Sequence, residues 1–215
     1  HYDHGNGVAV ADIDNDGFLD IYFVTQLGSN ELYKNIGNGT FENITKSAGV
    51  GLEDKVSVSA SFADIDNDGD LDIYFPQGSV FNPDKTLKES IFPVPKEHFP
   101  GNRLFRNQLV PSGKLAFTDV TEAAGVGHDG YGLGTAVGAY DNDGDLDLYL
   151  ANIGANALYR NDGNSTFTNV SQGDLKSISG AWVSWDGTWG DFDGDGNIDL
   201  FVANGAESRS GQLSP

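Results

Sequence analysis

Short runs of alternating apolar and polar residues predict β-strands along the whole chain. Residues 7–11 (Gly-Val-Ala-Val-Ala) lead into an aspartate-rich segment, and residues 19–24 (Leu-Asp-Ile-Tyr-Phe-Val) lead out of it. Two further short strands are expected around Leu32 and over residues 41–45, with glycine and asparagine between them. No segment has a convincing helical period, so the pattern predicts an all-β protein.

This pattern recurs with a period of about fifty residues. The aspartate-rich segment that begins at Asp12 returns at Asp64, 52 residues later. A third segment begins at Ala139 and a fourth at Asp191, again 52 residues apart. Recurrence at a fixed spacing of this size is the signature of a repeat architecture.

The interval between the second and third segments is longer, at 75 residues. Its extra length lies mostly between Pro76 and Gly101, a proline-rich stretch that we interpret as an inserted surface loop. A second motif, Asn-x-Leu-aromatic-basic-Asn, keeps its place in the first three periods, at residues 30–35, 102–107 and 156–161. The repeat register is therefore clear despite the insertion.

Four short strands in each period match one blade of a β-propeller. The predicted fold is therefore a propeller of four-stranded antiparallel blades, with about three and a half blades present as an incomplete ring. The expected blade units are residues 1–51, 52–127 with the inserted loop 76–101, 128–179, and an incomplete unit 180–215. More chain, or another copy, would complete the ring.

The aspartate-rich segments follow a nine-place pattern, D-x-D-x-D-G-x-x-D, that suits calcium. A hard cation takes six to eight oxygen ligands, and alternate residues of a tight turn point their carboxylates inward. Glycine at the sixth place permits the sharp bend. The expected ligands are the side chains at places one, three, five and nine and the carbonyl at place seven: Asp12, Asp14, Asp16, Phe18 and Asp20; Asp64, Asp66, Asp68, Asp70 and Asp72; Asp191, Asp193, Asp195, Asn197 and Asp199.

The third segment lacks its first ligand, because Ala139 stands where the others have aspartate. Its remaining ligands would be Asp141, Asp143 and Asp147, with the carbonyl of Asp145. The sequence thus predicts three strong calcium sites and a weaker fourth at residues 139–147. The alternative is a set of Asp-Gly turns without metal, although carboxylates held together without a cation repel one another.

Charge and composition exclude some classes of binding partner. The chain has 32 acidic residues against 12 Lys and Arg, a formal charge of -20, which disfavours nucleic acid and anionic membranes. More than half of the acidic residues lie in the four segments, which is typical of metal binding rather than of a solvated tail. No apolar run approaches the roughly 20 residues that span a bilayer, so membrane insertion is not expected. The absence of Met favours a processed product or a fragment.

The flanks of the loops separate the calcium-binding families. EF-hands and dockerins need flanking helices, and thrombospondin type 3 repeats need cysteine, which this chain lacks. The loops and the Asn-x-Leu motif together resemble the VCBS and FG-GAP repeats of integrin-α-like propellers, especially those of the cartilage acidic protein and UnbV-like group. The resemblance implies a propeller fold that binds calcium. Propellers of this family commonly have seven blades. The Phe-Gly and Gly-Ala-Pro signatures are absent, so integrin-like ligand binding is not implied.

The loops that lead into the first strands are expected at the edge opposite the metal loops, together with the insertion. They carry His128, Tyr131, Trp182 and Trp185, which we interpret as a candidate recognition surface. An exposed tryptophan there would suit stacking on a sugar ring, whereas burial under the insertion is the alternative. Trp189 aligns with apolar strand positions and is expected in the core. Glycosylation sequons, which coincide with the repeat pattern, occur at Asn38, Asn43, Asn164 and Asn169.

The first functional hypothesis is a secreted, non-catalytic module for adhesion, scaffolding or surface assembly, in which calcium rigidifies each blade. Its partner would be an unidentified protein or glycan, or a second copy. The alternative is a carbohydrate-binding or polysaccharide-lyase-type propeller, for which His128 or Tyr131 would be the candidate base. There is no nucleophile elbow, phosphate loop or carboxylate pair distinct from the metal ligands, so an enzyme is not expected.

Overall fold

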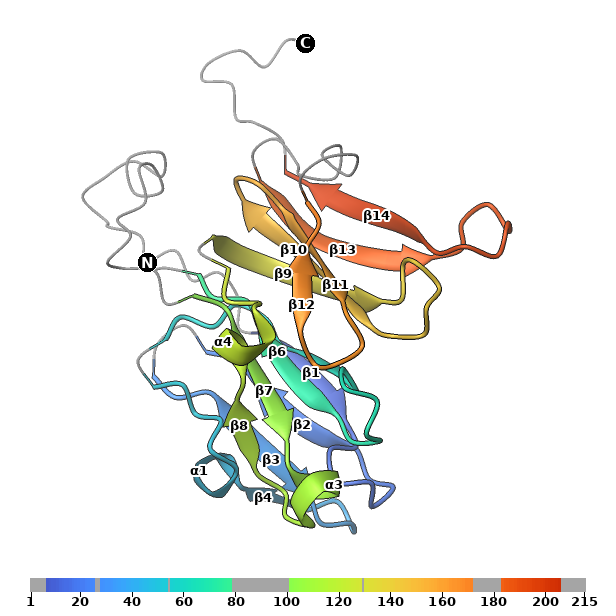
Figure 1. Cartoon of the computed structure of the whole chain (residues 1–215). Helices are drawn as coiled ribbons and strands as arrows, with labels where there is room; N and C mark the ends of the chain where they lie inside the picture. The colour runs from blue at the N-terminus through green and yellow to red at the C-terminus, as the bar shows by residue number, and fades with distance from the viewer. Residues whose placement is uncertain are drawn as a thin grey trace, which may run out of the picture.

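The structure, a computed structural model, describes residues 7–25, 28–53, 55–78, 101–128, 130–171 and 183–205. These residues form three four-stranded antiparallel sheets and one two-stranded antiparallel sheet (Figure 1). Every strand pairs with the strand that follows it in the same sheet. The expected all-β fold of propeller blades in an incomplete ring is confirmed.

The strands of each blade follow the order of the repeat. The first blade contains β1 (Val8–Ala11), β2 (Asp20–Phe23), β3 (Glu31–Asn35) and β4 (Phe41–Asn43). The second contains β5 (Ser61–Ala63), β6 (Asp72–Phe75), β7 (Arg103–Asn107) and β8 (Phe117–Asp119). The third contains β9 (Tyr131–Gly138), β10 (Asp147–Ile153), β11 (Ala157–Asn161) and β12 (Phe167–Asn169), and the fourth contains β13 (Ser184–Gly190) and β14 (Asp199–Asn204).

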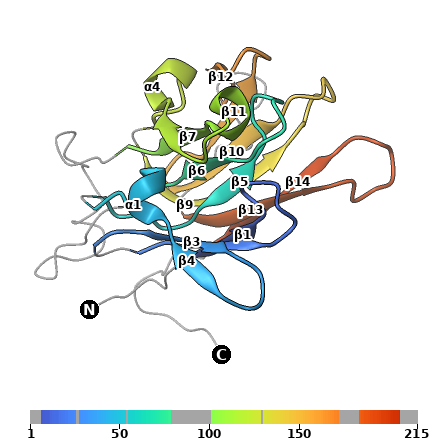
Figure 2. The ribbon, with the colours of Figure 1, turned by 90° about the horizontal axis from the view of Figure 1, so that it is seen from below.

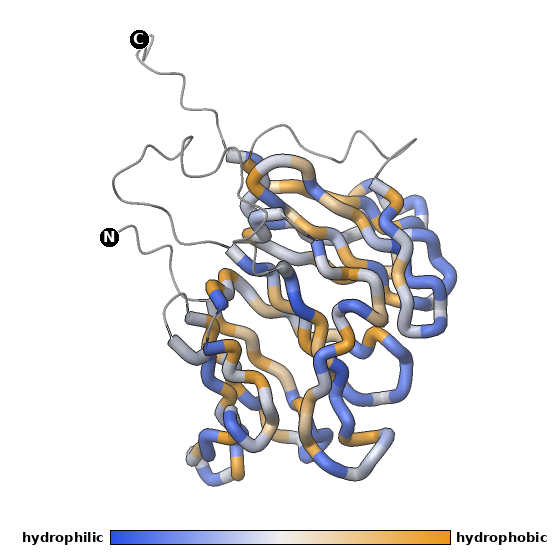
Figure 3. The backbone as a smooth tube through the Cα atoms, turned by 60° about the vertical axis from the view of Figure 1, so that its left-hand side comes forward, coloured by the Kyte–Doolittle hydropathy of each residue, from blue (hydrophilic) through white to orange (hydrophobic). Residues whose placement is uncertain are grey.

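The first strands of successive blades contact one another, β1 with β5, β5 with β9 and β9 with β13. Figure 2 shows the sheets fanning out from these strands, which is the arrangement of propeller blades around their axis. In Figure 3 the hydrophobic segments run along the strands and the hydrophilic ones gather in the turns. The alternating pattern of the sequence therefore corresponds to faces of sheets.

The hydrophobic core lies between blades. Tyr22 of the first blade packs in one cluster with Phe75 and Phe105 of the second. Tyr74 of the second blade occupies the equivalent place against the third, and Tyr149 of the third packs against the fourth. Full burial of a large apolar side chain contributes about 1.5–3 kcal/mol, so these contacts hold neighbouring blades together.

Buried asparagines also tie the second and third blades to the blade before them. Asn107 Nδ2, in β7, donates to the carbonyl of Ile13 in the first blade at 3.0 Å. Asn161 Nδ2, in β11, donates to the carbonyl of Ile65 in the second blade at 2.8 Å. Both are the last asparagine of the Asn-x-Leu motif. The motif therefore supplies a bond between blades as well as a strand.

Three single helical turns were not expected from the sequence. α1 (Thr45–Ala48) and α4 (Thr121–Ala124) follow the last strands of the first two blades, and α3 (Leu109–Ser112) lies between β7 and β8. Each ends at a glycine in the left-handed conformation, such as Gly49 with φ 80°. Four residues are too few to show a helical period, so pattern reasoning could not find them.

Candidate metal centres

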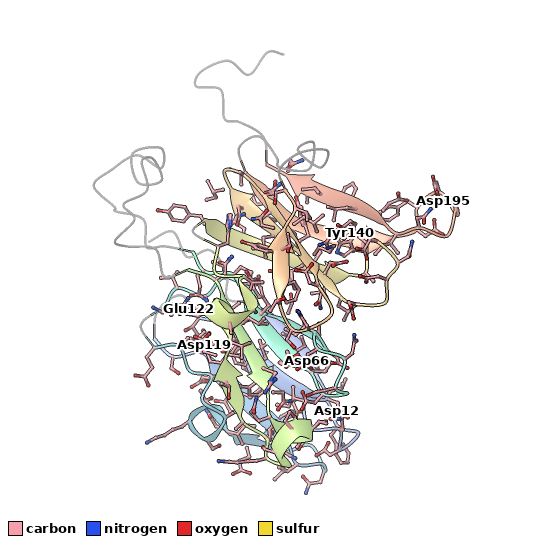
Figure 4. All side chains as sticks on the ribbon, in the orientation of Figure 1. Asp12, Asp66, Asp119, Glu122, Tyr140 and Asp195 are labelled. Carbon is pink, nitrogen blue, oxygen red and sulfur yellow. The ribbon has the colours of Figure 1, made fainter. Side chains whose placement is uncertain are left out.

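The four aspartate-rich loops join the first and second strands of each blade and lie along one side of the array. Figure 4 labels one residue from each loop, Asp12, Asp66, Tyr140 and Asp195. Because antiparallel neighbours in each sheet place their turns alternately at the two ends, all four loops fall at the same end.

The first-place aspartate folds the loop onto itself. In the first loop, Asp12 Oδ1 accepts the N–H of Asp16 at 3.1 Å, and Oδ2 accepts the N–H of Gly17 at 2.8 Å. Asp64 and Asp191 make the equivalent bonds in the second and fourth loops. The sixth-place glycine has φ 88° in the first loop and 99° in the second, as the sharp bend requires.

The ninth-place aspartate fixes the loop to the sheet. Asp72 Oδ2 accepts the N–H of Ile65 at 3.1 Å, and its Oδ1 accepts the N–H of Asn107 at 2.8 Å. Asp20 and Asp147 make the same pair of bonds in their own blades. These carboxylates are buried, so both oxygens are held in place.

Burial opposes the charge of these carboxylates. Desolvation raises the pKa of Asp72 to about 8, although the backbone donors Asn107 and Ile65 act to lower it. Desolvation likewise raises the pKa of Asp147 to about 6. A divalent cation beside such a group would favour its ionised form and remove this penalty.

Three loops bring carboxylates together closely enough to hold a metal ion. Oxygens from places one, three and nine lie within 4.8 Å of one another in the sets Asp12, Asp14 and Asp20; Asp64, Asp66 and Asp72; Asp191, Asp193 and Asp199. In two of these loops the third-place Oδ1, that of Asp14 or Asp66, is buried and accepts no hydrogen bond. An orphaned carboxylate oxygen at the point of convergence fits a cation.

The fifth-place aspartates serve the loop backbone. Asp16 Oδ1 accepts the N–H of Phe18 at 2.9 Å, and Asp68 and Asp195 bond the seventh-place N–H in the same way. They were expected to be ligands, but they stand outside the converging groups of three. Their contacts instead orient the residues at the seventh place, Phe18, Asp70 and Asn197.

The third loop differs from the other three at its first place. Ala139 offers no side-chain oxygen, and among the described residues Asp141, Asp143 and Asp147 do not form such a converging group. Ala139 also removes hydrogen bonds that hold the loop backbone. Because the first-place carboxylate also accepts two backbone N–H groups in the other loops, the third loop lacks that internal support.

A basic residue of the Asn-x-Leu motif stands beside the first two loops. Lys34 forms ion pairs with Asp14 and with Asp16, the latter at 3.2 Å. Arg106 Nη1 lies 3.7 Å from Asp66 Oδ2. Sequence reasoning assigned this position to the strand alone, although a basic residue recurs there in the motif of each of the first three periods.

Comparison with known proteins identifies the repeat. A family model described as an FG-GAP-like repeat matches residues 12–75 and 140–202, and each match spans two of the aspartate-rich loops. The chain belongs to the FG-GAP-like repeat family. The resemblance inferred from the motifs is thereby confirmed.

Relatives of this FG-GAP-like chain include Cartilage acidic protein 1 of Xenopus tropicalis, Mus musculus and Homo sapiens. Each is 30% identical over 99% of this chain and 30% of its own length. The chain therefore spans about 30% of the length of these curated relatives. A solved Agrocybe aegerita lectin, described as recognising non-reducing terminal N-acetylglucosamine, has a TM-score of 0.52 at 20% identity, covering 91% of this chain and 46% of the lectin. At that identity the likeness shows the fold alone.

The edge opposite the metal loops only partly matches the expected recognition surface. Trp185 is 52% exposed, whereas Tyr131 is 4% exposed and therefore does not belong to an open surface. His128 is half-buried, with its Nδ1 3.3 Å from the hydroxyl of Tyr159. Trp182 lies outside the described residues. Trp189 is partly buried and packs against Tyr149 of the core, as its alignment with apolar strand positions predicts.

Two of the sequons coincide with a structural element of the FG-GAP-like repeat. Asn43 Oδ1 accepts the N–H of Thr45 at 3.1 Å, and the Thr45 hydroxyl accepts the N–H of Leu32 at 2.8 Å. Asp119 and Thr121 make the same pair of bonds in the second blade, where no glycan can attach. Asn169 repeats the pattern in the third blade, and Asn38 and Asn164 are exposed in the turns before β4 and β12. Glycosylation at all four stays a prediction.

No helix in the described residues is long and apolar enough to cross a membrane.

Proposed function

We propose that this chain is a non-catalytic, calcium-binding propeller module that works outside the cell in adhesion, scaffolding or surface assembly. The observation that carries the proposal is the convergence of three carboxylates in each of three loops. In two of these loops a buried, unbonded oxygen completes the group. Calcium would be held by the aspartates at places one, three and nine, and would neutralise their mutual repulsion.

The role of calcium in this proposal is structural. Each loop closes the hairpin of the two inner strands of a blade, so a cation there would fix the strands against the neighbouring blade. Calcium sites of extracellular modules have dissociation constants of about 10⁻⁴ to 10⁻³ M. Sites of that strength stay filled only where calcium is abundant, which supports an extracellular location.

The test is calcium stoichiometry combined with thermal unfolding. We expect three bound calcium ions per chain in millimolar calcium, a fourth only at higher calcium, and a lower melting temperature in chelator. Calcium at about one hundred times its dissociation constant stabilises the folded state by about 2.7 kcal/mol for each site. A chain that binds no calcium and melts identically in chelator would overturn the proposal.

A matched pair of variants locates the ion. Asp66→Asn removes the charge at a converging oxygen and should delete or strongly weaken one site. Asp162→Asn removes an exposed carboxylate that pairs with Arg160 outside the loops, and should leave the stoichiometry unchanged. Equal calcium loss in both variants would mean that general charge, rather than the loops, attracts the cation.

A second candidate function is glycan binding. It is favoured by the exposed indole of Trp185 at the edge opposite the metal loops, where it could stack on a sugar ring. The lectin with a similar fold makes this candidate worth testing. A glycan array compares Trp185→Ala with Phe201→Ala, which removes an exposed aromatic side chain from β14. Binding lost only in Trp185→Ala supports the candidate, and no binding by the parent chain excludes it on that array.

We also propose that the partner of the first blade is a further blade of the same repeat. Val8, Val10 and Phe23 form an exposed apolar face on β1 and β2, and their equivalents in the second and third blades are buried or partly buried. If a second copy supplies that blade, sedimentation will show a concentration-dependent dimer that Phe23→Glu abolishes. A chain that stays monomeric at high concentration excludes the second copy.

A further inference from the structure

A side-chain amide joins each of the first three metal loops to the next loop along the array. The donor is always the asparagine at the fourth place, and the acceptor is always at the sixth or seventh place of the following loop. The bonds run from Asn15 Nδ2 to Gly69 O (3.1 Å), from Asn67 Nδ2 to Asp145 Oδ1 (2.6 Å) and from Asn142 Nδ2 to Asn197 Oδ1 (3.0 Å).

The backbone of the donor residue is unusual. Asn15, Asn67 and Asn142 have φ of 58°, 57° and 61°, in the left-handed region that few side chains other than asparagine enter readily. Gly194 takes the same place in the fourth loop with φ 78°. The fourth place therefore has a positive φ in all four loops, with either asparagine or glycine. Of these two residues, only asparagine also supplies a side-chain donor to the next loop.

We propose that the fourth-place asparagines couple calcium binding in neighbouring loops, so that the loops fill cooperatively. The inference rests on the proposed calcium binding. Each amide holds the residue at, or next to, the seventh place, whose carbonyl is the expected backbone ligand. A loop ordered by its ion fixes its asparagine, and the next loop then needs less ordering to accept an ion.

The third loop is bonded to both the second and the fourth loop. It lacks the first-place carboxylate that supports the backbone of the other loops, because that place is Ala139. Instead, Asn67 of the second loop holds its Asp145. Its own Asn142 in turn holds Asn197 of the fourth loop. The third loop is therefore held by the loop before it and itself holds the loop after it.

The test compares calcium isotherms of the parent chain and of Asn67→Gly by calorimetry. Glycine adopts positive φ freely, as Gly194 does in the fourth loop, so the substitution removes the amide without straining the backbone. Asn38→Gly is the matched control. Asn38 also has positive φ, at 52°, but its amide oxygen bonds Thr40 within its own turn.

The parent chain should bind calcium with a Hill coefficient above one. Asn67→Gly should flatten the isotherm and weaken binding at the third loop by about fivefold, the low end of typical coupling between sites, because the bond is exposed. Asn38→Gly should match the parent chain. Independent sites in the parent chain, or an isotherm as steep in Asn67→Gly as in Asn38→Gly, would overturn the inference.

Hydrogen exchange gives a second readout. Under calcium, Asp66→Asn should speed amide exchange in residues 139–147 of the third loop, although no residue of that loop is changed. Unchanged exchange there would overturn the coupling while leaving calcium binding intact. The calcium stoichiometry of the parent chain is measured first. A parent chain that binds no calcium would overturn the proposed function, whereas a chain that binds calcium without coupling would overturn only this inference.

Discussion

Phe41 and Phe117 begin the fourth strands of the first and second blades, yet Phe41 is 43% exposed and Phe117 is 8% exposed. The same difference runs through both blades. Phe62 of the second blade packs edge-on against Tyr22 of the first, with ring centroids 6.4 Å apart, whereas Val10 in the equivalent place of the first blade is exposed. Among the described residues, the second blade has a preceding blade to pack against and the first does not.

A blade of this repeat therefore supplies only one side of each interface. Its sequence prepares two apolar faces, but each face becomes core only when another blade covers it. Phe201 of the fourth blade is exposed for the same reason on the other face, where Tyr22, Tyr74 and Tyr149 are buried in the preceding blades. Stability in such arrays comes largely from interfaces between neighbours.

The largest expected effect is on core aromatics. Phe117→Ala should lower the free energy of unfolding by about 3–5 kcal/mol, the usual cost of deleting a buried phenyl ring. Phe41→Ala should cost about 1 kcal/mol or less, because its ring is largely in water already. Urea unfolding in calcium measures both. Equal losses in the monomeric chain would contradict this difference, whereas equal losses only at high protein concentration would indicate the proposed second copy on the first blade.

The next effect concerns the asparagines that end the third strands. Asn107→Ala should cost about 1–3 kcal/mol, because it strips the donor from the buried carbonyl of Ile13 in the neighbouring blade. Asn35→Ala removes a bond to Leu19 within its own blade and should cost less. Denaturant midpoints of the two variants, compared in one buffer, check this order. A larger loss in Asn35→Ala would contradict it.

The ninth-place carboxylates predict a dependence on pH that calcium reverses. Without calcium, the folded chain protonates Asp72 with a pKa of about 8, far above the ordinary value of about 3.9. The folded state therefore binds the proton more readily than the unfolded state, and stability should fall as pH rises from about 4 to about 8. Calcium needs the ionised form, so the stabilisation it gives should grow over the same range.

Melting temperatures at pH 5 and pH 8, each with calcium and with chelator, check this prediction. The chelated chain should melt higher at pH 5, and the shift produced by calcium should be larger at pH 8. A chelated chain that gains stability with rising pH would show that repulsion and burial among the loop carboxylates are not the dominant effect.

The smallest effect concerns the basic residue beside each of the first two loops. Lys34→Met should raise the calcium affinity of the first loop by a few fold, because the ammonium competes with the cation for Asp14 and Asp16 and such partly exposed pairs contribute about 0.2–1 kcal/mol. Arg106→Met should change the second loop less, since its nearest contact with Asp66 is 3.7 Å. Competition against a calcium indicator measures both affinities, and a weaker first loop in Lys34→Met would contradict the argument.

The sequence determined the repeat, the strand order and the defective third loop, because each depends on local spacing. Strand alternation has a period of two and the loop ligands lie within nine residues, so both can be recognised without knowing what lies nearby. The place of Trp189 in the core followed from the same register. The single-turn helices were not predicted, because one turn is too short to show a helical period. The expected surface position of Tyr131 was wrong, because its burial depends on residues distant in the sequence.

Only the tertiary structure decided which equivalent residues differ in role. Asn35 and Asn107 hold the same place in the motif, yet only Asn107 reaches across to another blade. Asn15, Asn67 and Asn142 appear in the sequence as spacers between ligands, but the packing of blades brings their amides onto the next loop. Spacing along the chain determines the contacts within a blade. Contacts between blades depend instead on how sheets about fifty residues apart in the sequence pack against one another.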